Sequence, residues 1–104
     1  MTDSSFVAYV GDADFHDGRV IDVQQIGTTV RVRVTGFSHR VFVAEFSGVR
    51  VVRSNRPEGM LLYALSERRC EAPLRRFVFL NWDEEDSAAL EIDAEEFTVH
   101  GEGE

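Results

Sequence analysis

The feature that most constrains the fold is an alternation of apolar and polar side chains at every second position. The segment VRVRVT, residues 30–35, places valine at one position and arginine or threonine at the next. Successive side chains of a β-strand point to opposite faces, so this segment predicts a strand with one buried and one solvated face. The chain is therefore expected to build a sheet whose inner side is lined by valine.

Other short segments have the same β-rich character and are separated by turn-forming sequences such as IGTT, GFSH and FSGV. These segments are the run that starts at Arg19, followed by RVFVAEF, VRVV, RRFVFLNW, AALEIDA and EFTVH. Together with residues 30–35 they give six or seven short strands. This spacing predicts a mainly β fold, bordering on the α+β class, formed by a curved antiparallel sheet or a sandwich.

One segment departs from the β-rich pattern. Residues 58–69, EGMLLYALSERR, contain no β-branched residue and consist largely of strong helix formers. Because Pro57 suits the first turn of a helix, we expect one short helix near residues 57–67. A strand is the alternative, since Leu61, Tyr63 and Leu65 also alternate.

The length and composition indicate one domain. The chain has 104 residues, of which 43% are hydrophobic and 29% charged, as in globular proteins. We expect a single domain over residues 1–104 with loose ends at residues 1–5 and 101–104. The start lacks a signal-peptide pattern, and the longest apolar run, MLLYAL, is far shorter than a membrane helix. A cytoplasmic location without a membrane segment is expected.

The charges are distributed unevenly along the chain. All 11 basic side chains are arginine, and the formal net charge is −8. Residues 83–104 carry ten acids and no basic residue, which disfavours a nucleic-acid partner and favours a basic protein. The alternative interpretation is that the acidic residues only keep the protein soluble. The candidate binding residues form an exposed loop between two predicted strands: Asp83, Glu84, Glu85 and Asp86.

The arginine-rich middle of the chain also invites a nucleic-acid interpretation. Residues 30–56 hold six arginines and one acid, interleaved with phenylalanines, as in surfaces that stack bases. The overall negative charge argues against that interpretation. We expect instead that a neighbouring strand with Glu91 and Asp93 neutralises Arg31 and Arg33 across the sheet.

An alternative candidate site lies in the segment GDADFHDG, which contains Asp14, His16 and Asp17. Its spacing does not fit a calcium-binding EF-hand loop, because the sixth position would be aspartate and the twelfth valine. His16 and Asp17 would point to opposite sides of a strand, unless the turn bends. The structural interpretation places Phe15 in the core and makes Asp17 and Gly18 the turn into the next strand.

The sequence offers no further support for catalysis. His39, Cys70 and His100 lack the spacing of a zinc site, so no metal and no cofactor are expected. The absence of lysine removes P-loop phosphate binding and Schiff-base chemistry. We therefore expect no catalytic residues, and the domain is interpreted as a binding module rather than an enzyme.

Three segments, FHDGRVIDV, AEFSGVRVV and LEIDAEEFTV, resemble a group of small bacterial β-domains with a histidine-aspartate start. Some members of that group are assigned as immunity proteins of polymorphic toxin systems. The resemblance covers residues 15–99 and implies a curved antiparallel sheet with His16 and Asp17 at the opening turn. Phe46, Gly48 and Val49 would form a central turn. The arginine-only basic content and the acidic C-terminal segment are not part of that pattern.

The expected function is protein binding, in particular immunity-type inhibition of a basic toxin. The alternative is a small hydrolase or ligand-binding domain that uses the cluster at His16 and Asp17.

Overall fold

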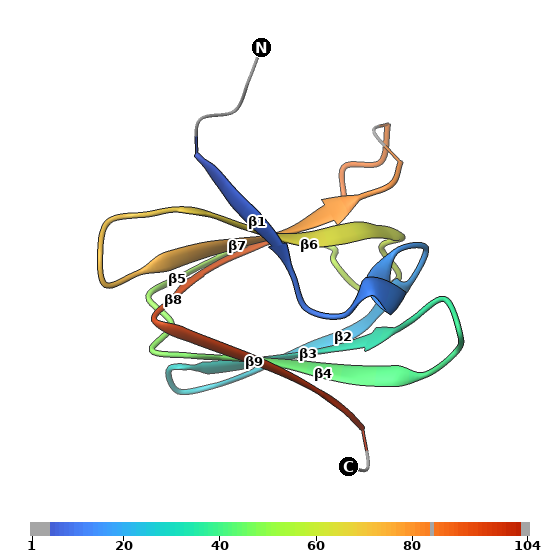
Figure 1. Cartoon of the computed structure of the whole chain (residues 1–104), viewed down its shortest axis with the longest axis horizontal. Helices are drawn as coiled ribbons and strands as arrows, with labels where there is room; N and C mark the ends of the chain where they lie inside the picture. The colour runs from blue at the N-terminus through green and yellow to red at the C-terminus, as the bar shows by residue number, and fades with distance from the viewer. Residues whose placement is uncertain (1–4, 84, 103–104) are drawn as a thin grey trace.

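The computed structural model describes residues 5–83 and 85–102, which form nine β-strands and one short 3-10 helix (Figure 1). The elements are β1 (Phe6–Val10), η1 (Ala13–Phe15), β2 (Arg19–Ile26), β3 (Thr29–Thr35), β4 (Val41–Ser47), β5 (Val51–Asn55), β6 (Leu62–Arg69), β7 (Arg75–Asn81), β8 (Ala89–Ala94) and β9 (Glu96–Gly101).

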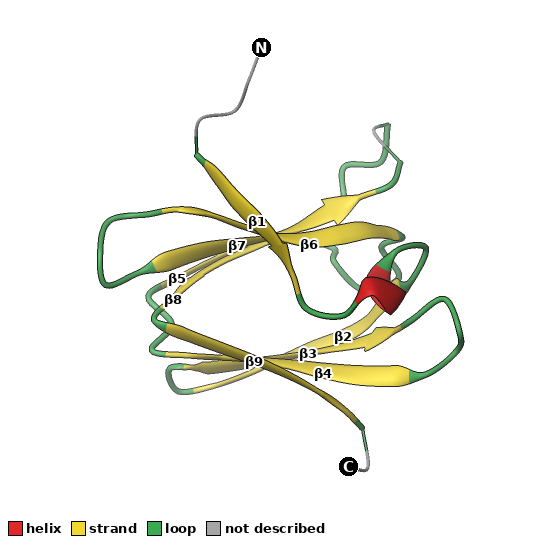
Figure 2. Cartoon of the chain, in the orientation of Figure 1, coloured by secondary structure: helices red, strands yellow, loops and turns green. Residues whose placement is uncertain are grey.

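The strands form two antiparallel sheets that face each other as a sandwich. One sheet has five strands in the order β1-β6-β7-β8-β5, and the other has four in the order β2-β3-β4-β9. Figure 2 shows that strands make up both layers and that η1 lies at one end between them. The prediction of a mainly β antiparallel fold is confirmed.

The alternating segment forms β3 and behaves as its pattern predicts. Val30, Val32 and Val34 are fully buried, whereas Arg31 on the opposite face is exposed. The neighbouring strand β4 buries Phe42 and Phe46 on the same inner side. One face of the four-stranded sheet is therefore apolar and the other polar, as expected for a half-buried antiparallel sheet.

Aromatic side chains join the two sheets in the core. Phe46 of β4 lies 5.1 Å, between ring centroids, from Phe77 of β7 and 5.9 Å from Phe79 of the same strand. Phe97 of β9 completes the cluster, with its ring centroid 4.9 Å from that of Phe77. These edge-on and tilted ring pairs favour a fixed separation of the layers.

The prediction of a helix near residues 57–67 is wrong, and the alternative prediction of a strand is correct. β6 runs from Leu62 to Arg69 between β1 and β7 and pairs with both. Leu62 and Leu65 are fully buried, with a bulge between Leu62 and Ala64 that shifts the simple alternation. Pairing along both edges and core burial outweigh the small differences in helix propensity.

The N-terminal strand β1 was not predicted, and the loose ends are shorter than expected. Residues 1–4 and 103–104 lie outside the described part of the chain. The carbonyl oxygen of Ser5 accepts a hydrogen bond from the Arg69 amide at 2.7 Å, and Gly101 belongs to β9. No helix within residues 5–83 and 85–102 has the length and apolar character needed to cross a membrane.

The passage from β1 to β2 carries the chain from one sheet to the other and positions the candidate site. Phe15 of η1 is buried, and the Leu62 amide donates to the Gly18 carbonyl at 2.8 Å. A Cβ at Gly18 would lie 2.4 Å from the Thr35 carbonyl oxygen, so only glycine fits this close approach. We call the end of the sandwich that carries η1 the η1 end (Figure 1). The β3–β4 hairpin and the link between β7 and β8 lie at this same end.

Candidate functional site

The predicted cluster of Asp14, His16 and Asp17 divides into two parts with different roles. The Asp14 carboxylate accepts hydrogen bonds from the Ser38 amide at 3.1 Å and the Ser38 hydroxyl at 2.6 Å. Its backbone carbonyl accepts from the Phe37 amide at 2.8 Å. Asp14 therefore fastens η1 to the β3–β4 hairpin through both of its carboxylate oxygens.

His16 and Asp17 do lie side by side, because the chain bends between them. Asp17 has a φ of 65°, which turns the backbone away from a strand path. His16 Nε2 lies 3.9 Å from Asp17 Oδ2. The structural interpretation placed Phe15 in the core and Asp17 and Gly18 at the turn, and Phe15 is buried while Asp17 and Gly18 directly precede β2.

Two aromatic rings contact His16, and further rings continue from them across the five-stranded sheet. The ring centroid of His16 lies 5.3 Å from that of Tyr63 on β6 and 5.5 Å from that of Trp82, which follows β7. Tyr63 is 5.2 Å from Trp82 and 6.2 Å from Tyr9 on β1. Phe6 continues the series, with its ring centroid 5.0 Å from that of Tyr9. We call these five side chains the aromatic patch.

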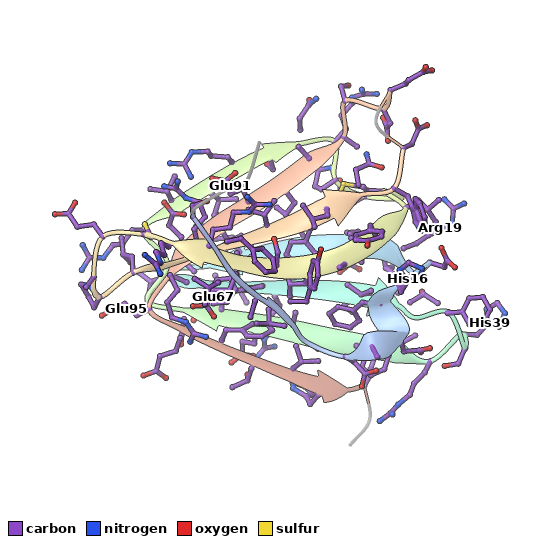
Figure 3. All side chains as sticks on the ribbon, turned by 45° about the horizontal axis from the view of Figure 1, so that its top comes forward. His16, Arg19, His39, Glu67, Glu91 and Glu95 are labelled. Atoms are coloured by element: carbon purple, nitrogen blue, oxygen red, sulfur yellow. The ribbon has the colours of Figure 1, made fainter. Side chains whose placement is uncertain are left out.

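The aromatic patch is exposed to solvent. The exposed fractions are 59% for Tyr9, 42% for Trp82, 38% for Phe6 and 37% for Tyr63. Figure 3 shows that His16 lies at the η1 end, on the same side of the molecule as Arg19 and His39. Large contiguous patches of exposed apolar surface typically mark contact sites.

Two hydrogen bonds hold the rings of the aromatic patch in place. The indole Nε1 of Trp82 donates to the Asp17 carboxylate. His16 Nδ1 lies 3.1 Å from the Tyr63 carbonyl oxygen, which can only accept, so Nδ1 carries the hydrogen. His16 Nε2 is then the ring nitrogen on the side of Asp17. The backbone turn and these contacts preorganise the surface.

Two hollows flank His16. One has a volume of about 370 Å³ and lies between β1, η1 and β6, with Tyr9, Asp12, Phe15 and Tyr63 among its lining residues. The other, of about 360 Å³, is lined by Ala13, Asp14, His16, Asp17 and Phe37. Among the described residues, no serine, threonine or cysteine lines either hollow, so neither hollow places an aliphatic hydroxyl or thiol nucleophile beside His16.

The acidic loop predicted as a binding site follows Trp82 directly. Asp83, Glu85 and Asp86 are exposed, and Glu84 lies outside the described residues. Asp83 Oδ1 accepts from the Glu85 amide at 3.0 Å. Asp86 accepts from Asn81 Nδ2 at 3.1 Å and from the Ala88 amide at 3.2 Å, which lowers the pKa of Asp86. Asp83 and Asp86 therefore also shape the loop.

The expected neutralisation of Arg31 and Arg33 by Glu91 and Asp93 is wrong. Arg31 binds Glu45 of the adjacent strand β4, with 2.8 Å between Nε and Oε2. The partners of Arg33 are Asp22, at 3.1 Å, and Glu102, at 3.2 Å. The two pairs of residues lie in different sheets, which the sequence pattern alone does not reveal.

Asp93 instead forms a separate network on the five-stranded sheet. Asp93 is 2% exposed, and its carboxylate accepts from Arg76 Nε at 2.9 Å and from Arg53 Nη1 at 3.4 Å. The hydrogen bond from Arg76 lowers the pKa of Asp93, and the same contact raises the pKa of Arg76. Glu91 joins the network through Arg53, at 2.9 Å.

Among residues 5–83 and 85–102, no three histidine, cysteine, aspartate or glutamate side chains are grouped so that they could hold an ion. The fold and the site together define an antiparallel β-sandwich with an exposed aromatic surface at one end. No protein-family model matches this chain, and no curated protein or solved structure matches it significantly.

Sequence reasoning found His16, Asp17 and the acidic loop but missed Tyr9, Tyr63 and Trp82. These three residues stand in apolar segments, where aromatic side chains are ordinarily part of a core. Tyr63 also lay in the segment predicted as a helix. Their proximity to His16 depends on the strand order, because β1 is adjacent to β6 in the sheet but distant from β6 and β7 in the sequence.

Proposed function

We propose that this domain binds a basic protein through the aromatic patch and the acidic groups around it. The observation that carries the proposal is the continuous contact of exposed rings from Phe6 through Tyr9 and Tyr63 to Trp82. Tryptophan and tyrosine are enriched among the residues that contribute most to protein–protein binding. A preorganised aromatic centre of this kind is suited to insertion into pockets of a partner.

The surroundings of the patch support a partner of positive charge. Asp12 and Asp17 lie beside the rings, and Asp83 and Glu85 follow Trp82 in the chain. A polar rim around an apolar centre is the usual organisation of a protein interface. Acidic rim groups attract a basic partner over several ångströms and accelerate association.

The pairing of the arginines in the four-stranded sheet supports a protein partner over nucleic acid. Arg31 and Arg33 are engaged with Glu45, Asp22 and Glu102, and the chain has a net charge of −8. Inhibition of a basic toxin in the cytoplasm is the particular form of binding that the resemblance to immunity proteins suggests. A hydrolase based on His16 and Asp17 has less support, because Asp14 is committed to the β3–β4 hairpin.

The test compares two exposed apolar residues at opposite ends of the sandwich. Wild type is used to capture basic proteins from an extract of its source, and each captured protein is purified and titrated by calorimetry. Trp82→Ala should weaken binding by about 2 kcal/mol or more, roughly 30-fold. Ile26→Ala, at a side chain that is 63% exposed next to the β2–β3 turn, should leave the affinity unchanged.

Equal affinities of the wild type and Trp82→Ala for every purified partner would contradict the proposal. Circular dichroism of both variants checks that the sandwich is retained.

A further inference from the structure

We propose that the hollow between Tyr9, His16 and Tyr63 receives an arginine side chain of the partner. The inference rests on the proposed function for the identity of the partner as a protein. The hollow has a volume of about 370 Å³, within the range of sites that enclose a small group. It opens beside the aromatic patch, so one side chain of a docked protein can enter it while others cover the rings.

The walls of the hollow suit a planar cation. The rings of Tyr9 and Tyr63 meet at 71° with centroids 6.2 Å apart, and the rings of His16 and Tyr63 also meet at 71°. Tyrosine rings attract a cation placed within about 6 Å of the ring centroid. Tyr9, His16 and Tyr63 all line the hollow, so a cation bound there lies beside three aromatic rings.

The charge of the lining favours a cation over a neutral or anionic group. Asp12 is the one charged carboxylate among the described lining residues of this hollow, and no arginine lines it. Asp12 Oδ1 accepts the Asp14 amide at 2.8 Å as the cap of η1. A carboxylate has further acceptor positions, so Asp12 can keep this cap and accept from a bound guanidinium.

Arginine fits these walls better than lysine. The guanidinium group is planar, stacks on aromatic faces, and is more weakly hydrated than an ammonium group. Its several N–H donors can reach a carboxylate while its plane lies against a ring. The basic partner proposed above would supply such a side chain.

The geometry of the hollow is set by rigid elements. Tyr9 and Tyr63 are held on the adjacent strands β1 and β6, and Phe15 is anchored in the core. Gly11 has a φ of 81°, and a Cβ there would lie 2.7 Å from Phe15 Cε2. The link from β1 to η1 can therefore pass close to Phe15 only with glycine at this position.

The experiment uses a small probe, so that it does not depend on the partner. Nα-acetyl-arginine amide is titrated into ¹⁵N-labelled protein, and amide chemical shifts are followed by NMR. Nα-acetyl-citrulline amide, which has the same shape but no charge, is the control ligand. The arginine probe should shift the amides of Gly11, Ala13 and Ala64 saturably, with a Kd that is roughly millimolar.

Two variants change the hollow by different means. Tyr9→Leu removes one ring, and Ala64→Leu fills space from the wall without altering charge. Each should weaken binding of the arginine probe at least about fivefold, the equivalent of one cation–ring contact. Ile26→Ala should bind the probe as wild type does. The dispersion of each spectrum shows whether the variant is folded.

Equal shifts by the citrulline control, or affinity unchanged in both Tyr9→Leu and Ala64→Leu, would overturn the assignment. The two proposals remain distinguishable. If the arginine probe fails to bind while Trp82→Ala still weakens binding of the partner, the proposed protein-binding surface is retained and the arginine pocket is rejected. If the probe binds but Trp82→Ala leaves all partners unaffected, the pocket stands without the proposed interface.

Discussion

Among the described residues, Asp93 is the one buried carboxylate. Its side chain is 3% exposed and lies between the guanidinium groups of Arg76 and Arg53. Removing one partner of a buried pair leaves the other charge without compensation. Asp93→Asn should therefore lower the free energy of unfolding by about 2 to 3 kcal/mol, measured by urea denaturation. Asp22→Asn, at the exposed pair with Arg33, should cost less than about 1 kcal/mol.

The contribution of Asp93 should also depend on pH in a defined direction. The pKa of this carboxyl in the folded protein lies below its ordinary value of 3.8, mainly because Arg76 donates to it. The unfolded state then takes up the proton at a higher pH than the folded state does. The stabilisation is present above the ordinary pKa and disappears as pH falls through the folded-state value.

The difference in unfolding free energy between wild type and Asp93→Asn should therefore shrink as pH falls from neutral to below that value. A difference that stays constant between neutral and strongly acidic pH would show that the pair with Arg76 is not the source of the stability.

At the scale of elements, the contact between η1 and the β3–β4 hairpin fixes the position of His16. The Asp14 carboxylate supplies both acceptors for Ser38, and a Cβ at Gly36 would lie 2.1 Å from Asp14 Oδ2. Asp14→Ala should lower the unfolding free energy by about 2 kcal/mol, because two hydrogen bonds to a charged group are lost. It should also speed hydrogen exchange at the Phe37 and Ser38 amides.

Ser38→Ala is the matched control for the hairpin contact. It removes the hydroxyl bond to Asp14 and keeps the amide bond, so it should cost about half as much as Asp14→Ala. Equal exchange rates at Phe37 in wild type and Asp14→Ala would contradict the role assigned to Asp14.

The local sequence pattern was sufficient to predict some secondary-structure elements and insufficient to predict others. The strict alternation of residues 30–35 identifies β3, because burial on one face requires a period of two. β6 could not be predicted in the same way, since its residues favour a helix in isolation and form a strand only between β1 and β7. The residues of the candidate site also differ in whether the sequence alone could bring them together. His16 and Asp17 are neighbours in sequence, whereas Tyr63 and Trp82 reach them through sheet topology.

For the molecule as a whole, the uneven charge places negative groups at both ends of the sandwich. Asp83, Glu85 and Asp86 lie exposed in the β7–β8 link at the η1 end. Glu95 lies at the opposite end, where β8 passes into β9 (Figure 3). Charge at either end lowers the net charge equally, but only charge near the aromatic patch is placed to guide a partner onto it. The two ends therefore allow a matched comparison.

Glu84→Gln combined with Glu85→Gln should slow association with a basic partner, because the two changes remove negative charge from the segment that follows Trp82. Asp83 and Asp86 are kept because their carboxylates accept backbone amides within the link. Association is measured by stopped flow from the fluorescence of Trp82, the one tryptophan of the chain and a member of the aromatic patch. We expect the on-rate at low salt to fall about 3-fold and to depend less on ionic strength.

The control for this experiment is Glu95→Gln combined with Glu96→Gln, which makes the same change in net charge at the far end. Both glutamates are exposed. If the loop steers the partner, this control should retain most of the wild-type on-rate and its salt dependence, because screening over the length of the molecule removes most of the effect of distant charge. Equal slowing by the two double variants would show that net charge alone governs association and that the acidic loop has no directional role.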